Sequence, residues 1–182
     1  MKESGIVRKL DNLGRLVIPK EIRRVLRIKE GSPIEFGLLP SGEIVLNKYS
    51  LVGQVSDYAD DFCKILGEIF DCVVLVGDRD SVISSYGISK KIAISAKLTE
   101  EVLDIMDSRA SYMACKEDQT TIVSVIEGDV NTYYSQVIFP ITIQGDVEGV
   151  LILLENKEDR CLNNEHITAL KLVSKFISLQ ME

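Results

Sequence analysis

The sequence is poor in metal-binding and cross-linking residues. It contains one histidine and four cysteines among 182 residues, and no two of the cysteines form a C-x-x-C pair. This spacing indicates neither a zinc site nor a disulfide framework. We therefore expect Cys63, Cys72, Cys115 and Cys161 to be buried free thiols, and we expect no bound metal.

Long apolar runs are also missing. No run approaches the roughly 20 residues that a membrane-spanning helix requires. The first residues lead into a charged segment without the apolar core of a secretory signal peptide. We expect a cytoplasmic protein with no membrane partner.

Patterns that mark common catalytic sites do not occur. The sequence has no P-loop, no G-x-G-x-x-G and no G-x-S-x-G. His166 falls near the expected start of a helix, where we expect it to be exposed and without a catalytic partner. Two acidic clusters are expected to be solvated surface rather than a cation site: Asp57, Asp60 and Asp61, and Glu155, Glu158 and Asp159. We expect no enzyme activity and no cofactor, although an unidentified small-molecule effector stays open.

Charge is distributed unevenly along the chain. The net charge is −7, but residues 1–49 hold ten basic and six acidic side chains, a local net charge of +4, so the remainder carries −11. Such segregation is expected when one module binds a polyanion and the other does not. An acidic surface that serves only solubility is the alternative explanation for the second part.

The first fifty residues have the pattern of short strands around one brief helix. Four strands are expected, over residues 5–11, 15–18, 33–39 and 43–49. Residues 12–14 form a turn, and Pro19 opens a helix that should end near Arg27. A module this small cannot easily bury enough surface alone, so we expect an obligate dimer. Its two-fold axis would match the symmetry of duplex DNA.

The remaining residues have the pattern of an α+β domain that follows a short linker at residues 50–54. Long amphipathic helices are expected from 55 to 70 and from an Asn163 or Asn164 cap to Met181, and a shorter helix capped by Thr99 over 98–107. Apolar runs bounded by turns predict strands over residues 72–76, 82–85, 121–126, 136–143 and 148–154. The result should be an antiparallel sheet bracketed by helices.

The motif Asp11-x-x-Gly14-Arg15-x-x-Ile18-Pro19-Lys20-x-x-Arg23-x-x-Leu26-x-Ile28-x-x-Gly31 resembles the swapped-hairpin DNA-binding module of the AbrB-type transition-state regulators. By architecture and position, the second half resembles a GAF domain, a module that often binds small molecules. The resemblance implies an α+β chain: a β-rich swapped-hairpin dimeric barrel over residues 1–52, then a GAF-like antiparallel sheet flanked by helices over 54–182. It also implies a homodimer through the first domain and a homotetramer through the second.

The same resemblance implies double-stranded DNA as the partner. The family's DNA-contacting basic positions fall on Arg8, Lys9, Arg15, Arg23 and Arg24. The planar guanidinium suits phosphates and guanine edges. One short helix reaches few base edges, so we expect recognition to depend on DNA shape, with a loose, A·T-leaning consensus. The whole chain is similar to regulators of sporulation that act on late, forespore-type genes as activator or repressor, depending on the promoter.

A small-ligand pocket is a further hypothesis for the second domain. Ser84, Ser85, Tyr86 and Lys90 offer hydroxyls and a cation for an acidic group, but a polar strand end and loop is the better explanation from the sequence alone. Residues 132–135, Thr-Tyr-Tyr-Ser, are a similar case, because tyrosines occur in cores and dimer contacts as well as in pocket walls.

Two other function classes stay open. Swapped-hairpin modules also occur in antitoxins, but those usually bind their toxin through a disordered tail, and the periodic second half of this chain disfavours that role. An enzyme built on residues 54–182 would need a reactive group that the sequence does not indicate.

Overall fold

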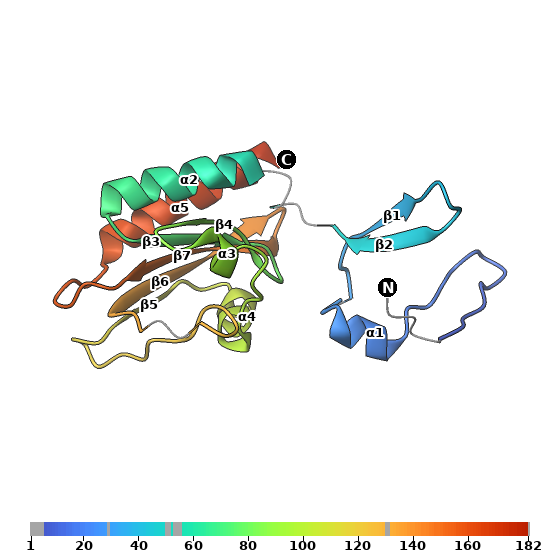
Figure 1. The fold of residues 1–182 in the computed structure, drawn as a ribbon, viewed down its shortest axis with the longest axis horizontal. Coiled ribbons are helices and arrows are strands. Elements are labelled where there is room, and N and C mark those ends of the chain that lie inside the picture. The colour runs from blue at the N-terminus through green and yellow to red at the C-terminus, as the bar shows by residue number, and fades with distance from the viewer. Residues whose placement is uncertain (1–5, 29, 50–51, 53–55, 130–131, 182) are drawn as a thin grey trace. The chain divides into compact units, whose positions relative to one another are not determined.

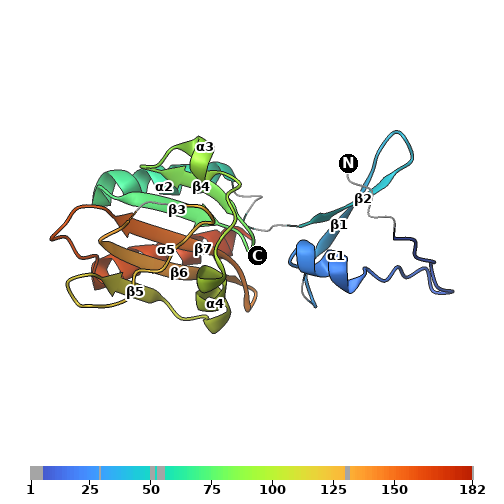
Figure 2. The same cartoon turned by 60° about the horizontal axis from the view of Figure 1, so that its bottom comes forward.

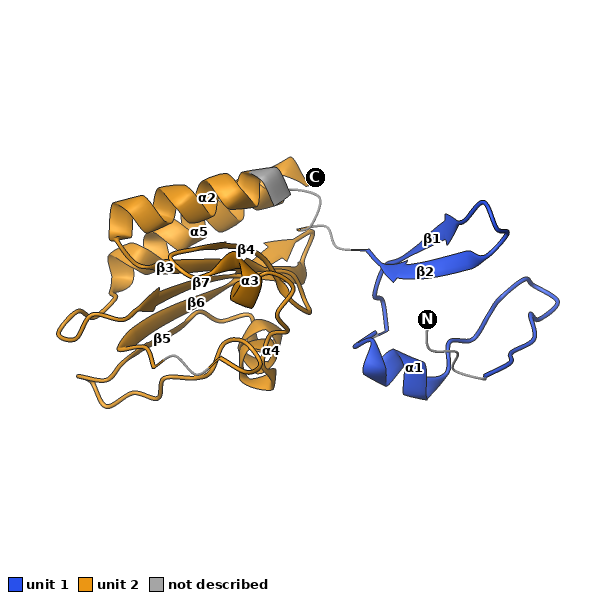
Figure 3. Ribbon diagram, viewed as in Figure 1, with its two compact units in different colours: residues 1–49 blue, residues 50–182 orange. Residues whose placement is uncertain are grey.

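The computed structural model describes residues 6–28, 30–49, 52, 56–129 and 132–181. Two compact units divide the chain, residues 1–49 and residues 50–182 (Figure 1, Figure 3). The predicted linker over 50–54 falls almost entirely outside the described residues. None of the described helices combines the length and the apolar character that a bilayer crossing needs.

The first unit contains a short helix and a hairpin. Helix α1 (Lys20–Val25) begins after Pro19, which has the φ of −56° that its ring imposes. Strands β1 (Ile34–Leu38) and β2 (Ile44–Lys48) pair antiparallel around the Pro-Ser-Gly turn. The helix and this second hairpin confirm the predictions.

The expected strands over 5–11 and 15–18 are not formed in the described part of this single chain, so that prediction was wrong for the isolated subunit. The turn between them does form: Asp11 accepts from the backbone N–H groups of Leu13 and Arg15, and Gly14 adopts a φ of +74°. Beyond the turn, the two arms have no third strand to pair with. The arms hydrogen-bond at the turn, where Asp11 N–H donates to Arg15 O at 3.2 Å, but Val7 and Val17 stay 88% and 72% exposed, so no apolar cover holds the arms together as strands.

The second unit is built around a five-stranded antiparallel sheet with strand order β4-β3-β7-β6-β5. Its strands are β3 (Val73–Gly77), β4 (Val82–Tyr86), β5 (Tyr112–Cys115), β6 (Ser135–Ile143) and β7 (Asp146–Glu155). Helices α2 (Ser56–Phe70) and α5 (Asn164–Gln180) cover one face of the sheet (Figure 1). The other face carries α3 (Lys90–Ala93), α4 (Glu100–Ser108) and the loop between β5 and β6 (Figure 2).

Apolar side chains fill both faces of this sheet. In β7, Leu151 and Leu153 pack under α2 and α5, while Ile152 and Leu154 pack on the opposite side. A strand covered on both faces needs a continuous apolar run rather than an alternating one. This is why the runs over 72–76, 136–143 and 148–154 predicted their strands well.

Residues 121–126 do not form the strand expected of them. Val125 and Ile126 are buried on the sheet face opposite α2 and α5, but the backbone has no ladder partner and makes only an isolated bridge from Ile126 to Leu98. In the amide orientation that satisfies both of its ends, Gln136 donates to Val123 O (3.0 Å) and accepts from Val123 N (2.8 Å). A side chain of the sheet therefore takes the place of a neighbouring strand.

The cysteines divide into two pairs. Cys63 and Cys72 are buried and free, as expected, and burial raises the pKa of Cys63 to about 11 and that of Cys72 to about 12. Cys115 and Cys161 instead form a disulfide with a Cα–Cα distance of 5.6 Å. The expectation of free thiols was wrong for this pair because the fold brings together residues that lie 46 positions apart in sequence.

Two polar residues expected at the surface are buried near the start of α5. Glu155, expected to be solvated, is 1% exposed, and its carboxylate pairs with Arg160 at 3.0 Å and accepts from the backbone N–H of Lys157 at 2.9 Å. Arg160 also donates to the carbonyl of Phe70. A buried carboxylate needs such a partner, and Arg160 thereby ties the end of β7 to the end of α2.

His166 is also buried rather than exposed. Its ring lies 4.5 Å from the ring of Phe70, and its Nδ1 accepts from the backbone N–H of Asn163 in a capping box at the start of α5. Burial, and secondarily the charge of Arg160, lowers the pKa of His166. The histidine thus contributes to the fold as a neutral ring.

This lowered pKa predicts a loss of stability in mild acid. The unfolded chain takes up the proton on His166 at a higher pH than the folded chain does, so stability is present above pH 6.5 and declines as the pH falls below it. We expect the urea concentration at the unfolding midpoint of the second unit to be lower at pH 5.5 than at pH 7.5. Circular dichroism of wild type and His166→Gln tests this, because the variant should lose much of the decline; an equal decline in both would contradict the prediction.

Candidate functional site

The five predicted DNA-contacting side chains are all exposed and lie on two segments of the first unit. Arg8 and Lys9 precede the turn at residues 12–14, and Arg15 follows it. Arg23 and Arg24 occupy the last turn of α1, where a positive charge also suits the helix dipole. The structure therefore places three of these cations on one loop and two on one helix.

An acidic side chain orients one of these cations. Arg15 Nε lies 2.7 Å from Asp11 Oδ2, and the backbone N–H of Arg15 donates to Asp11 Oδ1 at 2.8 Å. These bonds, the backbone one foremost, lower the pKa of Asp11 and keep the carboxylate ionised at neutral pH. The sequence motif places Asp11 and Arg15 on either side of the turn, and the structure shows why: the pair closes it.

The first unit exposes an unusual amount of apolar surface. Among its described residues, only Pro19 is buried. The exposed large apolar side chains are Ile6, Val7, Leu10, Leu13, Leu16, Val17, Val25, Leu26, Phe36, Leu38, Leu39 and Ile44. Surface of this extent on a small module marks an interface.

A second apolar surface runs along α2 and α5 of the other unit. Its exposed members are Tyr58, Ile65, Ile69, Leu172, Phe176 and Leu179. The ring of Phe176 makes edge contacts with Tyr58 (6.4 Å between centroids) and Phe62 (5.4 Å), which join the two helices into one surface. The spacing of these residues by three and four positions puts them on one face of each helix. We call these six residues the helical patch.

The predicted ligand residues hold helices to the sheet. Ser84 is fully buried and donates to Asp60 of α2, and Lys90 Nζ lies 3.2 Å from the same carboxylate. The bond from Ser84, foremost, lowers the pKa of Asp60. The Tyr86 ring occupies the space beside Gly67, where a Cβ would lie 2.0 Å from it. A ligand role for these side chains stays a prediction.

Ser85 differs from its neighbours because its buried Oγ has no hydrogen-bond partner within the described structure. Of the acidic cluster in α2, Asp60 makes the contacts given above and Asp61 is exposed. The side chain of Asp57 lies outside those described.

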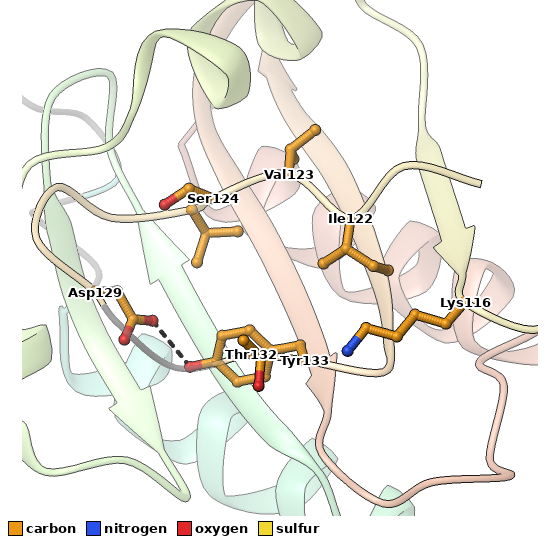
Figure 4. Close-up of a pocket in the computed structure, with 8 residues that line it drawn as sticks. Lys116, Ile122, Val123, Ser124, Asp129, Thr132 and Tyr133 are labelled. Carbon is orange, nitrogen blue, oxygen red and sulfur yellow. Dashed lines mark hydrogen bonds between the residues drawn. The ribbon is translucent and has the colours of Figure 1, made fainter. Parts of the chain in front are cut away.

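A cavity of about 390 Å³ lies elsewhere in the second unit, at the loop between β5 and β6. It is lined by Lys116, Ile122, Val123, Ser124, Val125, Asp129, Thr132 and Tyr133 (Figure 4). Tyr133 donates to Asp129 at 3.1 Å, and the amine of Lys116 points toward the tyrosine. Sequence reasoning considered Thr132 and Tyr133 but missed Lys116, Ser124 and Asp129, because their proximity depends on how this loop folds.

Solved structures share the fold of the second unit. The GAF domain of an Acinetobacter phosphoenolpyruvate-protein phosphotransferase aligns with a TM-score of 0.59 at 13% identity, covering 74% of this chain and 84% of that one. The corresponding GAF domain from Coxiella burnetii aligns with a TM-score of 0.57 at 10% identity, covering 88% of each chain. Identities this low establish the fold alone, and they confirm the GAF-like architecture.

Sequence comparisons cover both units. The chain is 36% identical to stage V sporulation protein T of Bacillus subtilis over 182 residues, 100% of this chain and 99% of the relative. It is 36% identical to the transition state regulatory protein AbrB of the same organism over 93 residues, 51% of this chain and 88% of the relative.

Family models match each unit separately. Residues 7–53 match a model described as antidote-toxin recognition MazE, bacterial antitoxin. Residues 54–182 match a model described as stage V sporulation protein T C-terminal, transcription factor. On this match and the relative aligned over almost its full length, the chain belongs to the stage V sporulation protein T family of transcription factors.

Proposed function

We propose that this chain is a DNA-binding transcription regulator that acts in the cytoplasm during sporulation, on late, forespore-type genes that it activates or represses according to the promoter. The observation that carries the proposal is the set of five exposed cations on a unit whose net charge is +4 within a chain of net charge −7. Family membership supports a regulator rather than an enzyme.

The first unit binds DNA as a homodimer in this proposal. Two copies would pair their exposed apolar arms, so that the residues at 5–11 and 15–18 find the strands that a single chain lacks. The dimer would present Arg8, Lys9 and Arg15 twice, related by a two-fold axis that duplex DNA shares.

The second unit joins such dimers into a homotetramer. The helical patch has the composition of a protein interface, with Tyr58 and Phe176 as aromatic members. Pairing two patches would remove Leu172 and Leu179, each about two-thirds exposed, from water. Linking two DNA-binding dimers raises the affinity for paired sites through effective concentration, without any new DNA contact.

The cavity supports a sensing role for the second unit. Lys116 supplies a cation, and Ser124 and Thr132 supply hydroxyls beside apolar walls, a combination that suits a small organic acid. A small-molecule effector bound there would act at the loop between β5 and β6.

An antitoxin is the second candidate, favoured by the family model that matches residues 7–53. Antitoxins that use this module present a tail that folds on the toxin. Here the residues behind the module form a sheet with apolar clusters on both faces. A folded second domain supports regulation of transcription instead.

Removing two arginines should weaken DNA binding. In a dimer, Arg23→Gln/Arg24→Gln deletes four of ten candidate cations, and we expect an affinity loss of about 10- to 100-fold. If half of the ten meet phosphates, the slope of log affinity against log salt should be about −4 to −5 for wild type and about −2 to −3 for the variant. Fluorescence anisotropy on an A·T-rich duplex measures both quantities.

The matched control is Lys91→Gln/Lys97→Gln, which removes two exposed lysines of the second unit. It should bind DNA like the wild type. Equal losses in both double variants, or a wild-type slope near zero, would count against the proposed surface.

A charge in the helical patch should stop tetramer formation. Leu172 is 69% exposed, so Leu172→Glu leaves the fold intact but buries a carboxylate in the proposed interface. We expect light scattering to give the mass of a dimer for this variant and of a tetramer for the wild type. Ile92→Glu, at an exposed apolar residue on α3 outside the patch, is the control and should stay tetrameric. A tetramer in both variants would refute this arrangement.

The cavity should retain a small acid in protein purified under gentle conditions. Native mass spectrometry of the full chain is expected to show an added small-molecule mass that Lys116→Met loses, because the variant removes the cation and keeps the apolar stem. An added mass that survives in Lys116→Met would place the ligand elsewhere.

A further inference from the structure

The disulfide joins two parts of the second unit that a buried serine also links. Cys115 ends β5, an edge strand of the sheet, and Cys161 lies in the loop that leads into α5. Ser135 donates through its hydroxyl to Ala114 O at 2.8 Å and accepts from Leu162 N at 3.0 Å. These two residues are the immediate neighbours of Cys115 and Cys161.

The serine bridge does not depend on the sulfur–sulfur bond. Its two hydrogen bonds link residue 114 to residue 162 through Ser135, which is fully buried. After reduction, the bridge would keep the two thiols within reach of each other, so that the bond can re-form inside one chain. A pair held in this way can open and close without unfolding.

Access to solvent distinguishes Cys161 from the other three cysteines. Cys161 is half-buried, whereas Cys115 is 2% exposed, Cys63 1% and Cys72 8%. Burial also raises the pKa of Cys63 to about 11 and that of Cys72 to about 12, which keeps them as unreactive thiols. An oxidant or reductant in solution therefore meets Cys161 first.

We propose that Cys115 and Cys161 form a reversible redox site in which Cys161 is the sulfur that reacts with small peroxides and with low-molecular-weight thiols, and Cys115 is the resolving sulfur. The site lies within the second unit, so it is independent of the proposed DNA surface. Failure of either proposal would leave the other standing.

Oxidation proceeds in two steps that balance. The Cys161 thiolate attacks a peroxide oxygen, forms an S–O bond and breaks the O–O bond, which gives a sulfenic acid and, after protonation, one water molecule. The Cys115 thiolate then attacks the Cys161 sulfur, and the sulfenic oxygen leaves as a second water. Two thiols lose two electrons and the peroxide gains them; two equivalents of an external thiol reverse the change through a mixed disulfide.

The disulfide lies next to the cavity and next to the start of α5, the helix that carries part of the helical patch. Lys116, which follows Cys115 in sequence, lines the cavity. Cys161 lies two residues before the Asn163 cap of α5. The disulfide thus fixes the wall of the cavity to the start of α5.

Glu117 provides a chemical test of the assignment. Its Oε2 lies 3.6 Å from Cys161 Sγ, and a carboxylate this close repels a thiolate. Because Glu117 is exposed, Glu117→Gln should leave the fold unchanged. It should speed oxidation by hydrogen peroxide about 3- to 10-fold by favouring the Cys161 thiolate.

The experiment uses the full chain, reduced with a dithiol, freed of the reductant and treated with hydrogen peroxide. Mass spectrometry after alkylation should show the loss of two hydrogen atoms and protection of Cys115 and Cys161, in wild type and in the control Cys72→Ala. Reoxidation should raise the melting temperature of the second unit by about 10–15 °C, since the bond closes a 46-residue separation. Cys161→Ser should show neither change.

Three results would overturn the proposal. The first is a pair that stays alkylatable after peroxide treatment, and the second is a Glu117→Gln variant that oxidises no faster than wild type. The third is one zinc ion per reduced chain with both sulfurs blocked, because Cys115, Cys161 and Glu117 also offer three ligand atoms within 4.8 Å of one another. That outcome would assign the group to metal binding instead.

Discussion

The first unit leaves most of its large apolar side chains exposed in a single chain, and the proposed dimer follows from this shortage of core. Val7 is 88% exposed, Val25 73% and Phe36 71% in one chain. A module of about fifty residues gains too little from burial to offset its lost chain entropy unless a second chain covers it. In the proposed dimer, the cations on the same loop and helix are presented in pairs, and DNA binding would depend on the same association that stabilises the unit.

The second unit solves the same problem within one chain. Its sheet is covered on both faces, so α2 and α5 each bury one stripe and leave a second stripe, the helical patch, exposed. On the opposite face the cover is mostly loop, and the cavity lies there. In the proposed function, the helical patch on one face serves assembly and the cavity on the other face serves sensing. Two links stabilise the end of the sheet that leads into α5. Arg160 holds β7 to α2 through Glu155, and the disulfide of Cys115 holds β5 to the loop before α5.

The sequence predicted what depends on local periodicity and missed what depends on tertiary proximity. Helices α2 and α5 and strands β3, β6 and β7 follow from apolar spacing that only one backbone conformation can bury. Residues 121–126 carry a strand-like pattern, but they lie over the sheet face, where the side chain of Gln136 bonds the backbone of Val123 and Thr99 bonds the carbonyls of Ser124 and Val125. The arms at residues 5–11 and 15–18 carry the same pattern without a partner in their own chain. No window of sequence could reveal the disulfide or the position of Lys116 in the cavity.

If the chain assembles as proposed, selectivity among genes would come from the spacing of DNA sites as well as from contacts. Helix α1 has six residues, fewer than two turns, so each subunit can offer few side chains to base edges. A tetramer that carries two DNA-binding dimers binds its second site from a local concentration set by the link between the units. The proposed tetramer would therefore favour promoters with two suitably spaced sites over promoters with one, even when the individual sites are alike. An effector in the cavity, or a redox change at Cys161, would then alter which promoters are bound without touching a single DNA contact.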